Sequence, residues 1–150
     1  RQRQMCIRDR TYMGAWSADF RVVIPVSWFY EFDSRVRPQI PYAVFPLHAP
    51  FWLLCGLASQ FTATDGTRQL SISIITVEPN QVLKSVGHHR SPAIINHPEE
   101  ASTWLRGTKQ DALSVLQPFP DEYMGVEEVP MGIKIPGNEK ISLPGSLLDP

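Results

Sequence analysis

The chain has 150 residues, of which 43% are hydrophobic and 19% are charged, and its formal net charge is −1. This composition is typical of a single soluble globular domain with a core of its own, and no apolar run approaches the roughly 18 residues of a membrane helix. Fourteen prolines disfavour long helices, and the near-neutral charge excludes a protein that binds nucleic acid through bulk positive charge.

The first ten residues, RQRQMCIRDR, differ from the rest of the chain. They hold four of the fourteen basic residues and one acid, and without them the net charge is −4. They resemble a translated sequencing adapter and show no apolar period or turn pattern, so we interpret residues 1–10 as a non-native scar and exclude them from the fold. Residues 11–150 then form one domain. Cys6 and Cys55 give no disulfide framework, which favours a reducing cytoplasm.

The first part of the domain predicts strands. Residues 21–32, RVVIPVSWFYEF, are rich in β-branched and aromatic side chains, and Pro25 indicates an edge position or a bulge. Alternation places Trp28, Tyr30 and Phe32 on one face, with Phe29 and Glu31 on the other. Two further strands are expected at 41–47 and at 51–61, and the second is apolar enough to be central. An Asp-Gly turn then leads into QLSISIITVE, which alternates apolar residues with serine.

The second part predicts short helices. PNQVLKSVG (79–87) suits a helix closed by Gly87, and PAIIN (92–96) suits a short strand. Pro98 opens a helix with acids in its first turn, and KQDALSVL suits another. From residue 117 the chain is rich in proline and glycine, with MGIKI and ISL as strand candidates. The fold class is therefore α+β: a curved, mostly antiparallel β-sheet or barrel-like core with short peripheral helices.

Glu31 is the first candidate for chemistry. Its neighbours Trp28, Phe29, Tyr30 and Phe32 are aromatic, and desolvation by such side chains raises a carboxyl pKa toward values useful in proton transfer. The alternative is a strand-end glutamate that points into water.

The stretch SVGHHRSP raises three possibilities. An imidazole can serve as an acid or a base, and Arg90 offers a planar fork for phosphate, so a stretch that holds His88, His89 and Arg90 can serve as a reaction centre. It can also be an ordinary hydrogen-bonded turn. A metal-dependent hydrolase built on His88, His89 and His97 is the weakest alternative, because adjacent histidines point in different directions and no H-x-x-x-H or cysteine set completes a site. No metal and no cofactor are expected.

The combination is more specific than its parts. In order, the chain contains IPVSWFYEF, FWLLCGLAS, ISIITVEPNQ, GHHRSPAIIN, EEASTWL and LQPFP, and over residues 21–128 this series resembles the SOS response associated peptidase (SRAP) family. The resemblance implies the family's fold and a role in the SOS response and DNA repair. It implies a protein that binds single-stranded DNA and crosslinks to abasic sites through an N-terminal cysteine, forming a thiazolidine, and that removes its own initiator methionine.

The resemblance also assigns residues. Glu31 matches the family's active-site glutamate, and His88 matches its active-site histidine. Arg90 matches an arginine that contacts DNA near the lesion, and Thr76 matches a threonine near the site. Ser91 replaces the usual methionine in the turn, where it makes the wall of the DNA-binding pocket smaller and more polar. The implied protein is a monomer of the bacterial cytoplasm, encoded by a bacterium or phage and located at the nucleoid when on DNA.

One part of the family pattern is missing. The family's cysteine is the second residue of an M-C-G-R start that lies several tens of residues before the F-Y-E strand, whereas 24 residues separate Cys6 from Glu31 here. We therefore interpret Met5-Cys6 as a coincidence and residues 11–150 as a partial SRAP domain that lacks its N-terminal portion. This chain is expected to be inactive and poorly stable, because sheet edges would be exposed. The alternative function is a non-catalytic module that binds single-stranded DNA through the same fold.

Overall fold

The computed structural model describes Trp16 and residues 20–130, and residues 1–15, 17–19 and 131–150 lie outside that description. The sequence-predicted strands MGIKI and ISL and the segment 1–10 fall on those other residues. In the described part, two three-stranded antiparallel sheets are joined by a two-stranded ladder, with three short α-helices beside them. The predicted α+β class with antiparallel sheets is confirmed.

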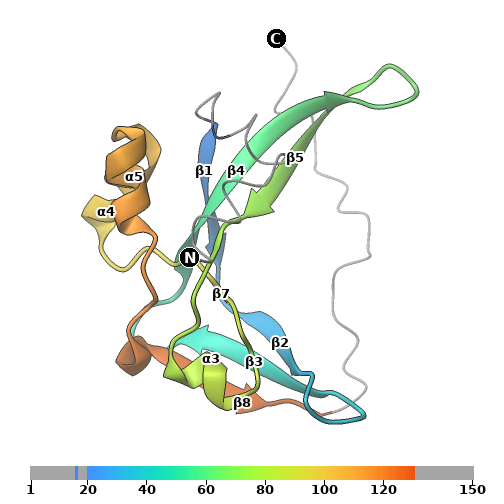
Figure 1. Ribbon diagram of the computed structural model, residues 1–150, viewed down its shortest axis with the longest axis vertical. Helices are drawn as coiled ribbons and strands as arrows, with labels where there is room; N and C mark the ends of the chain where they lie inside the picture. Colours follow the sequence, from blue (N-terminus) through green and yellow to red (C-terminus); the bar gives the residue numbers. More distant parts are fainter. Residues whose placement is uncertain (1–15, 17–19, 131–150) are drawn as a thin grey trace.

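The first sheet lies in the upper part of Figure 1 and has the order β1–β4–β5. Its strands are β1 (Arg21–Val26), β4 (Trp52–Thr62) and β5 (Arg68–Ile74). The apolar strand β4 is central and β1 is an edge, as the sequence predicts. A tight turn joins β4 to β5, and Gly66 in that turn has a φ of 85°, which glycine adopts without strain.

The second sheet lies below the first and has the order β2–β3–β8. Its strands are β2 (Phe29–Asp33), β3 (Ile40–Pro46) and β8 (Met124–Glu128). The prediction of one continuous strand over 21–32 was wrong, because the chain leaves the first sheet after Val26 and pairs with β3 from Phe29 onward. The split lets one segment contribute an edge strand to both sheets, and the predicted alternation of faces in β2 is retained.

The segment 74–95 connects the two sheets. A short ladder pairs β6 (Thr76–Val77) with β7 (Ser91–Pro92), and α3 (Gln81–Ser85) lies between these strands in the chain. The predicted strand 92–96 is regular only at its start. Beyond β7 the chain keeps contact with β4 through a bridge between Leu54 and Ile94 and through hydrogen bonds at residues 93 and 95.

Two helices cover one side of the first sheet, on the left of Figure 1: α4 (Pro98–Arg106) and α5 (Lys109–Val115). Pro98 begins α4 as predicted. The fully buried Trp104 attaches this helix to β1, since its indole Nε1 donates to the carbonyl oxygen of Val22 at 2.8 Å. The Arg21 guanidinium lies over the same ring and donates to the Gly107 carbonyl at the end of the helix.

The strand β5 exposes its apolar side chains, whereas a strand usually buries them. Its serines are half-buried, whereas Leu70, Ile72 and Ile74 are 67%, 51% and 46% exposed. The alternation that the sequence predicts is present, but within the described residues its apolar side faces outward. Among the described helices, none is long and apolar enough to cross a membrane.

Candidate active site

The helix α3 has a local design that fixes the position of His88. Gly87 has a φ of 78° and follows the helix C-cap. Its N–H donates to the Lys84 carbonyl at 3.1 Å, and the His88 N–H donates to the Leu83 carbonyl at 3.0 Å. These two bonds form a Schellman motif, in which a left-handed glycine turns the chain back over the helix end. The backbone of His88 is therefore part of a defined helix terminus.

The other end of α3 is fixed by Asn80. Its side-chain Oδ1 accepts from the Leu83 N–H at 3.0 Å, so it caps the helix. Its Nδ2 donates to the Phe119 carbonyl at 3.1 Å and contacts the sulfur of Met124 at 3.4 Å. Asn80 is 7% exposed. A buried polar side chain satisfied on both ends thus joins α3 to the segment that leads into β8.

Glu31 and His88 meet although they lie 57 positions apart in the chain. The distance between Glu31 Oε2 and His88 Nε2 is 2.5 Å, and the side chains are 16% and 24% exposed. Glu31 comes from the middle of β2, on the face that also carries Phe29 and Asp33. The sequence-derived expectation that these two groups converge is met by this contact, and both remain open to solvent over part of their surface.

The second ring nitrogen of His88 also has a polar partner. His88 Nδ1 lies 3.1 Å from the carbonyl oxygen of Arg90. A carbonyl oxygen only accepts, so Nδ1 carries the hydrogen of that bond. The short contact between Nε2 and the carboxylate then requires a second proton, held by the imidazole or by Glu31. Both ring nitrogens of His88 therefore have a partner, and Nε2 is the one that faces the carboxyl group of Glu31.

Burial sets the acidity of this pair. Desolvation by the surrounding chain raises the pKa of Glu31, and the charge and hydrogen bond of His88 partly oppose that rise. The net direction is upward, which is the direction that suits a carboxyl group to proton exchange near neutrality. The ring of His89 stacks on that of His88, with 5.8 Å between centroids and 10° between planes. The two imidazole rings are therefore nearly parallel neighbours.

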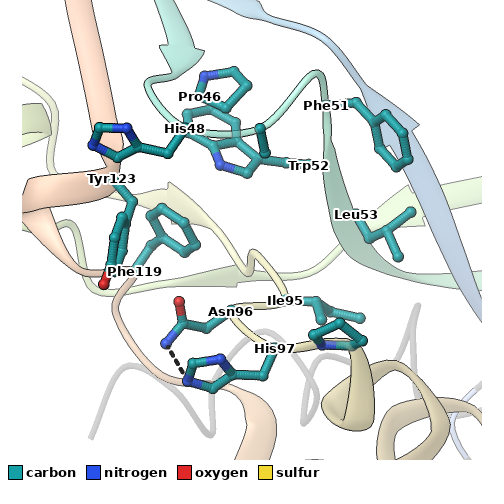
Figure 2. Close-up of a pocket in the computed structure, with 12 residues that line it drawn as sticks. Pro46, His48, Phe51, Trp52, Leu53, Ile95, Asn96, His97, Phe119 and Tyr123 are labelled. Atoms are coloured by element: carbon teal, nitrogen blue, oxygen red, sulfur yellow. Dashed lines mark hydrogen bonds between the residues drawn. The ribbon is translucent and has the colours of Figure 1, made fainter.

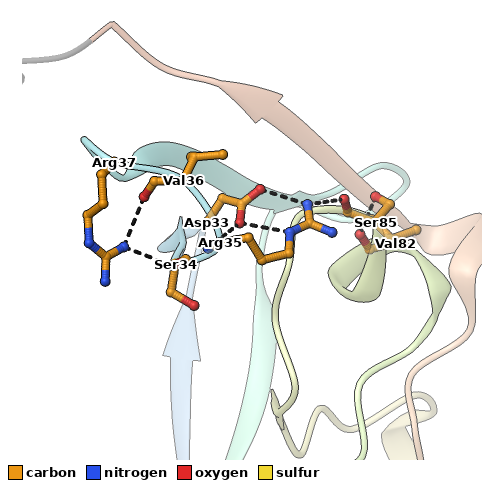
Figure 3. Close-up of polar contacts among 7 residues, drawn as sticks. All are labelled: Asp33, Ser34, Arg35, Val36, Arg37, Val82 and Ser85. Carbon is orange, nitrogen blue, oxygen red and sulfur yellow. Dashed lines mark hydrogen bonds and ion pairs between the residues drawn. The ribbon is translucent and has the colours of Figure 1, made fainter.

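A bridge between β2 and α3 supports the pair from one side (Figure 3). Asp33 is 5% exposed and accepts two hydrogen bonds from Arg35, from Nε at 2.9 Å and from Nη2 at 2.6 Å. The same Nη2 donates to the Ser85 carbonyl at 3.0 Å, at the C-terminal end of α3. Asp33 lies two residues after Glu31 on the same face of β2, and Ser85 lies three residues before His88. The bridge therefore ties together the two elements that carry the candidate acid and base.

The three residues assigned to DNA contact occupy different environments. Arg90 is exposed and lies directly after the two histidines. Thr76 is half-buried, and the β6–β7 ladder pairs it with Pro92, next to the end of the histidine turn. Ser91 is 1% exposed, and its hydroxyl donates to the Pro92 carbonyl at 2.9 Å. Ser91 is thus a buried support of the turn, and we do not carry it into the proposed DNA interface.

The other reactive side chains lie apart from this pair. Cys55 is fully buried in β4, and burial raises the pKa of its thiol to about 12, which makes it a core residue rather than a nucleophile. His97 precedes α4, and its Nε2 lies 3.2 Å from Asn96 Nδ2. Within Trp16 and residues 20–130, no three histidine, cysteine or acidic side chains gather as a metal site would require. A hydrolase built on His88, His89 and His97 finds no support in that part of the chain.

A pocket of about 520 Å³ lies near α4 (Figure 2). Trp52 and Phe119 form apolar walls, and His48, His97 and Tyr123 bring polar atoms to it. Glu31 and His88 do not line this pocket. Its size is therefore no argument for placing the reaction there, and the carboxyl group and imidazole in direct contact are the stronger candidate site.

Comparison with known proteins decides the family. The sequence profile of the SOS response associated peptidase (SRAP) family matches residues 3–135. This chain belongs to the SRAP family. The family assignment made from the sequence is confirmed. The match begins inside the segment 1–10 that was set aside above.

Curated SRAP relatives carry informative names. The chain is 30% identical over 129 residues to the abasic site processing protein YoaM of Bacillus subtilis (strain 168), covering 82% of this chain and 55% of the relative. It is 29% identical over 128 residues to the abasic site processing protein YoqW of Bacillus phage SPbeta, covering 82% of this chain and 56% of the relative. The chain thus spans somewhat more than half the length of the curated relatives that it matches.

Solved structures show the same SRAP fold. A crystal structure of a protein from Bacteroides thetaiotaomicron superposes with a TM-score of 0.77 at 22% identity, covering 86% of this chain and 57% of that one. A crystal structure of a protein from Bordetella bronchiseptica gives a TM-score of 0.76 at 19% identity, covering 85% and 63%. The predicted SRAP-like fold is confirmed.

Sequence reasoning missed the residues that support the site. The contact between Asp33 and Arg35 and its link to α3 were not predicted. A signal was present: Asp33 shares the face of Glu31 by strand alternation, and an arginine two residues after an aspartate can fold back on it in a turn. The double role of Asn80 was also missed, because the sequence shows a cap but not its long-range partner.

Proposed function

We propose that this chain is the acid-base part of a SRAP protein that binds single-stranded DNA and forms a covalent crosslink at abasic sites. The observation that supports the proposal is the direct contact between the Glu31 carboxyl group and His88 Nε2. The names of the Bacillus and phage relatives indicate abasic DNA as the substrate. Family resemblance supplies the nucleophile, an N-terminal cysteine carried by the complete protein.

The proposed reaction needs acid-base groups and no oxidant. The ring-opened sugar presents an aldehyde, and the cysteine amine attacks it and forms an imine as water leaves. The thiol sulfur then adds to the imine carbon, and the thiol proton moves to the nitrogen, which closes a thiazolidine. Glu31 accepts the proton that frees the amine, and His88 protonates the sugar-ring oxygen as the ring opens. The same pair would assist removal of the initiator methionine.

Arg90 and Thr76 form the proposed contact with DNA. Arg90 is exposed directly beside the two histidines, so its guanidinium can bind a phosphate next to a lesion held at His88. The net charge of the chain is close to zero, so DNA binding must come from such local contacts. Thr76 stands on the strand that pairs with the end of the same turn. Both residues are assigned by family resemblance.

The non-covalent part of the proposal is tested with the 150-residue chain. Fluorescence anisotropy compares labelled single-stranded DNA that contains a stable abasic analogue with duplex DNA. Arg90→Ala should weaken binding and lower the salt dependence of log Kd by about 0.7, the contribution of one phosphate on a single strand. Arg68→Ala, at an exposed arginine of the β4–β5 hairpin, is the matched control. Equal losses for both variants would show a diffuse charge effect and contradict a site at Arg90.

The covalent part is tested with a protein that carries the same domain behind an N-terminal cysteine, translated from the complete reading frame. Incubation with abasic single-stranded DNA and a denaturing gel should show a shifted band. Glu31→Gln and His88→Gln should slow its formation by at least about tenfold, because acid-base catalysis contributes on the order of 10²–10⁴. The alternative, a non-catalytic module of the same fold, predicts binding without any covalent band.

A further inference from the structure

A groove on the far face of β2 has a chemistry unlike that of the Glu31 site. Alternation turns Trp28 and Tyr30 away from Glu31, toward the outside of the β2–β3–β8 sheet. Trp28, Tyr30, Ala43, Phe45 and Glu127 line a groove of about 260 Å³ there. Three aromatic rings, one methyl group and one carboxylate are an unusual set for a surface that only faces water.

The register of the sheet explains how this groove forms. Tyr30 pairs with Ala43, and Ala43 pairs with Glu127, so the three side chains form one row across three strands. Ala43 in the middle is small and leaves a low floor. Trp28 stands against Tyr30 edge to face, with 4.7 Å between ring centroids and 68° between planes. These two rings make a corner at one end of the row.

Phe45 forms the neighbouring wall, and its placement depends on Gly125. The two residues pair across β3 and β8. A Cβ added at Gly125 would lie 2.5 Å from Phe45 Cε2, so only glycine allows the ring to lie this close to the strand. The groove is thus bounded by Trp28 and Tyr30 on one side and by Phe45 on the other, with the Glu127 carboxylate at the third strand.

The charge of the groove selects its ligand. The faces of aromatic rings carry negative quadrupole potential and attract organic cations, and a carboxylate adds a full negative charge. Glu127 is exposed, and no ion pair joins it to any residue in the described part of the chain. A phosphate would be repelled here, so this face is unsuited to the DNA backbone that the opposite side of β2 is proposed to meet.

We propose that this groove binds an arginine side chain of a partner protein. A guanidinium is planar and stacks on aromatic faces, and its fork of N–H donors matches a carboxylate in two parallel hydrogen bonds. Trp28 is 45% exposed, so its ring is accessible to a side chain delivered from another molecule. The sheet would then separate two functions: abasic DNA on the Glu31 face and a basic protein segment on the Trp28 face.

The test uses NMR titration of the isotope-labelled 150-residue chain with blocked arginine and with blocked citrulline, which has the same shape and no charge. Blocked arginine should shift the Trp28 indole and Glu127 amide signals with an affinity about fivefold or more above that of citrulline. Trp28→Ala and Glu127→Gln should each reduce the response. Glu128→Gln removes the neighbouring carboxylate on the opposite face of β8 and should leave it unchanged.

Several outcomes would overturn the proposal. Equal shifts with blocked arginine and blocked citrulline would mean that the groove binds side chains without regard to their charge. A larger effect of Glu128→Gln than of Glu127→Gln would place the cation on the other face. Tetramethylammonium binding more tightly than arginine would indicate a small quaternary ligand, and an oligothymidylate shifting the same signals would indicate nucleic acid. Because Trp28 and Glu127 are both exposed, loss of the fold in one variant still leaves the other informative.

Discussion

Gly87 and Asp33 are packed so closely that no side chain fits between them. A Cβ at position 87 would overlap the Oδ1 atom of Asp33 and the Nε atom of Arg35. Gly87 is the left-handed residue that ends α3, and Asp33 ends β2. The two candidate catalytic groups lie beside this contact, Glu31 two residues before Asp33 and His88 one residue after Gly87. The close approach of the Asp33 and Arg35 side chains to the Gly87 backbone thus helps to set the separation of the acid-base pair.

Gly87→Ala should be the most damaging small substitution near the site. It adds a Cβ to a left-handed residue, at a cost of about 1 kcal/mol, and forces the Asp33–Arg35 bridge to move, for a total of roughly 2–4 kcal/mol. Urea unfolding measures this loss. The signals of the His88 ring should also shift in an NMR spectrum, because its backbone lies in the displaced turn.

Gly66→Ala is the matched control for Gly87→Ala. Gly66 has a φ of 85°, but a Cβ there would meet nothing within 4 Å. Gly66→Ala should therefore cost only the strain of a left-handed backbone at a residue with a side chain, about 1 kcal/mol. If both variants lose the same free energy of unfolding, the close approach of Gly87 to Asp33 does not contribute to the cost of the substitution.

The sequence predicts the local environments of Glu31 and His88 better than it predicts the residues that hold them in place. The period of two in WFYEF places Glu31 opposite Trp28, and glycine before the histidines indicates a helix end, so the environments of Glu31 and His88 follow from local rules. Their contact does not, because the two residues lie 57 positions apart in the chain and only the tertiary fold brings them together. It was family resemblance that predicted the convergence.

Other features depend on competition between distant segments. The break after Val26 could not be predicted, because RVVIPVSWFYEF has strand propensity throughout and the division depends on which sheet each half pairs with. The strand β8 was missed because EYMGVEE is polar and follows a proline-rich stretch. Its pairing with β3 supplies the stability that local propensity lacks.

The Asp33–Arg35 bridge should make stability depend on pH in the acid range. Hydrogen bonds from Arg35 hold the pKa of Asp33 below its usual value. A lowered folded-state pKa gives stability that is present above the unfolded pKa of about 3.9 and is lost as pH falls through the folded value. Asp33→Asn should lower the Tm by several degrees at pH 7 and by less at pH 3. A Tm difference between the variant and the parent that does not change with pH would mean that the charge of Asp33 does not stabilise the fold.

Asn80 should be worth more than an ordinary helix cap. Asn80→Ala removes the bond to the Leu83 N–H and leaves the buried Phe119 carbonyl without its donor, for a combined loss of about 2–3 kcal/mol. Thr108→Ala removes a comparable cap from α5 at an exposed position and should cost about 1 kcal/mol. Chemical denaturation of both variants measures the difference. Equal losses would show that the link to Phe119 adds nothing.

The exposed apolar face of β5 should limit solubility. Ile72 is 51% exposed between two other exposed aliphatic residues of the same strand. Ile72→Lys should raise the concentration at which light scattering detects aggregation, by roughly fivefold or more, since about 1 kcal/mol of apolar contact is removed per association. Leu113→Lys, at a leucine of α5 that is 40% exposed, is the control and should change little. An equal gain from both would point to net charge as the cause.

Glu31→Gln should stabilise the fold while it slows the proposed chemistry. Burial raises the pKa of Glu31, so the folded state resists ionisation of this group. A raised folded-state pKa means that stability is highest below the unfolded carboxyl pKa of about 4.3 and falls as pH rises through the folded value. Glutamine has no charge to desolvate, so the variant should unfold in more urea than the parent at pH 8, by up to about 1 kcal/mol, and the difference should shrink at pH 4. Glu78→Gln, at an exposed glutamate, should show no such trend. A loss of stability at pH 8 would mean that the contact with His88 outweighs desolvation, and the carboxyl group would then be a poor proton carrier.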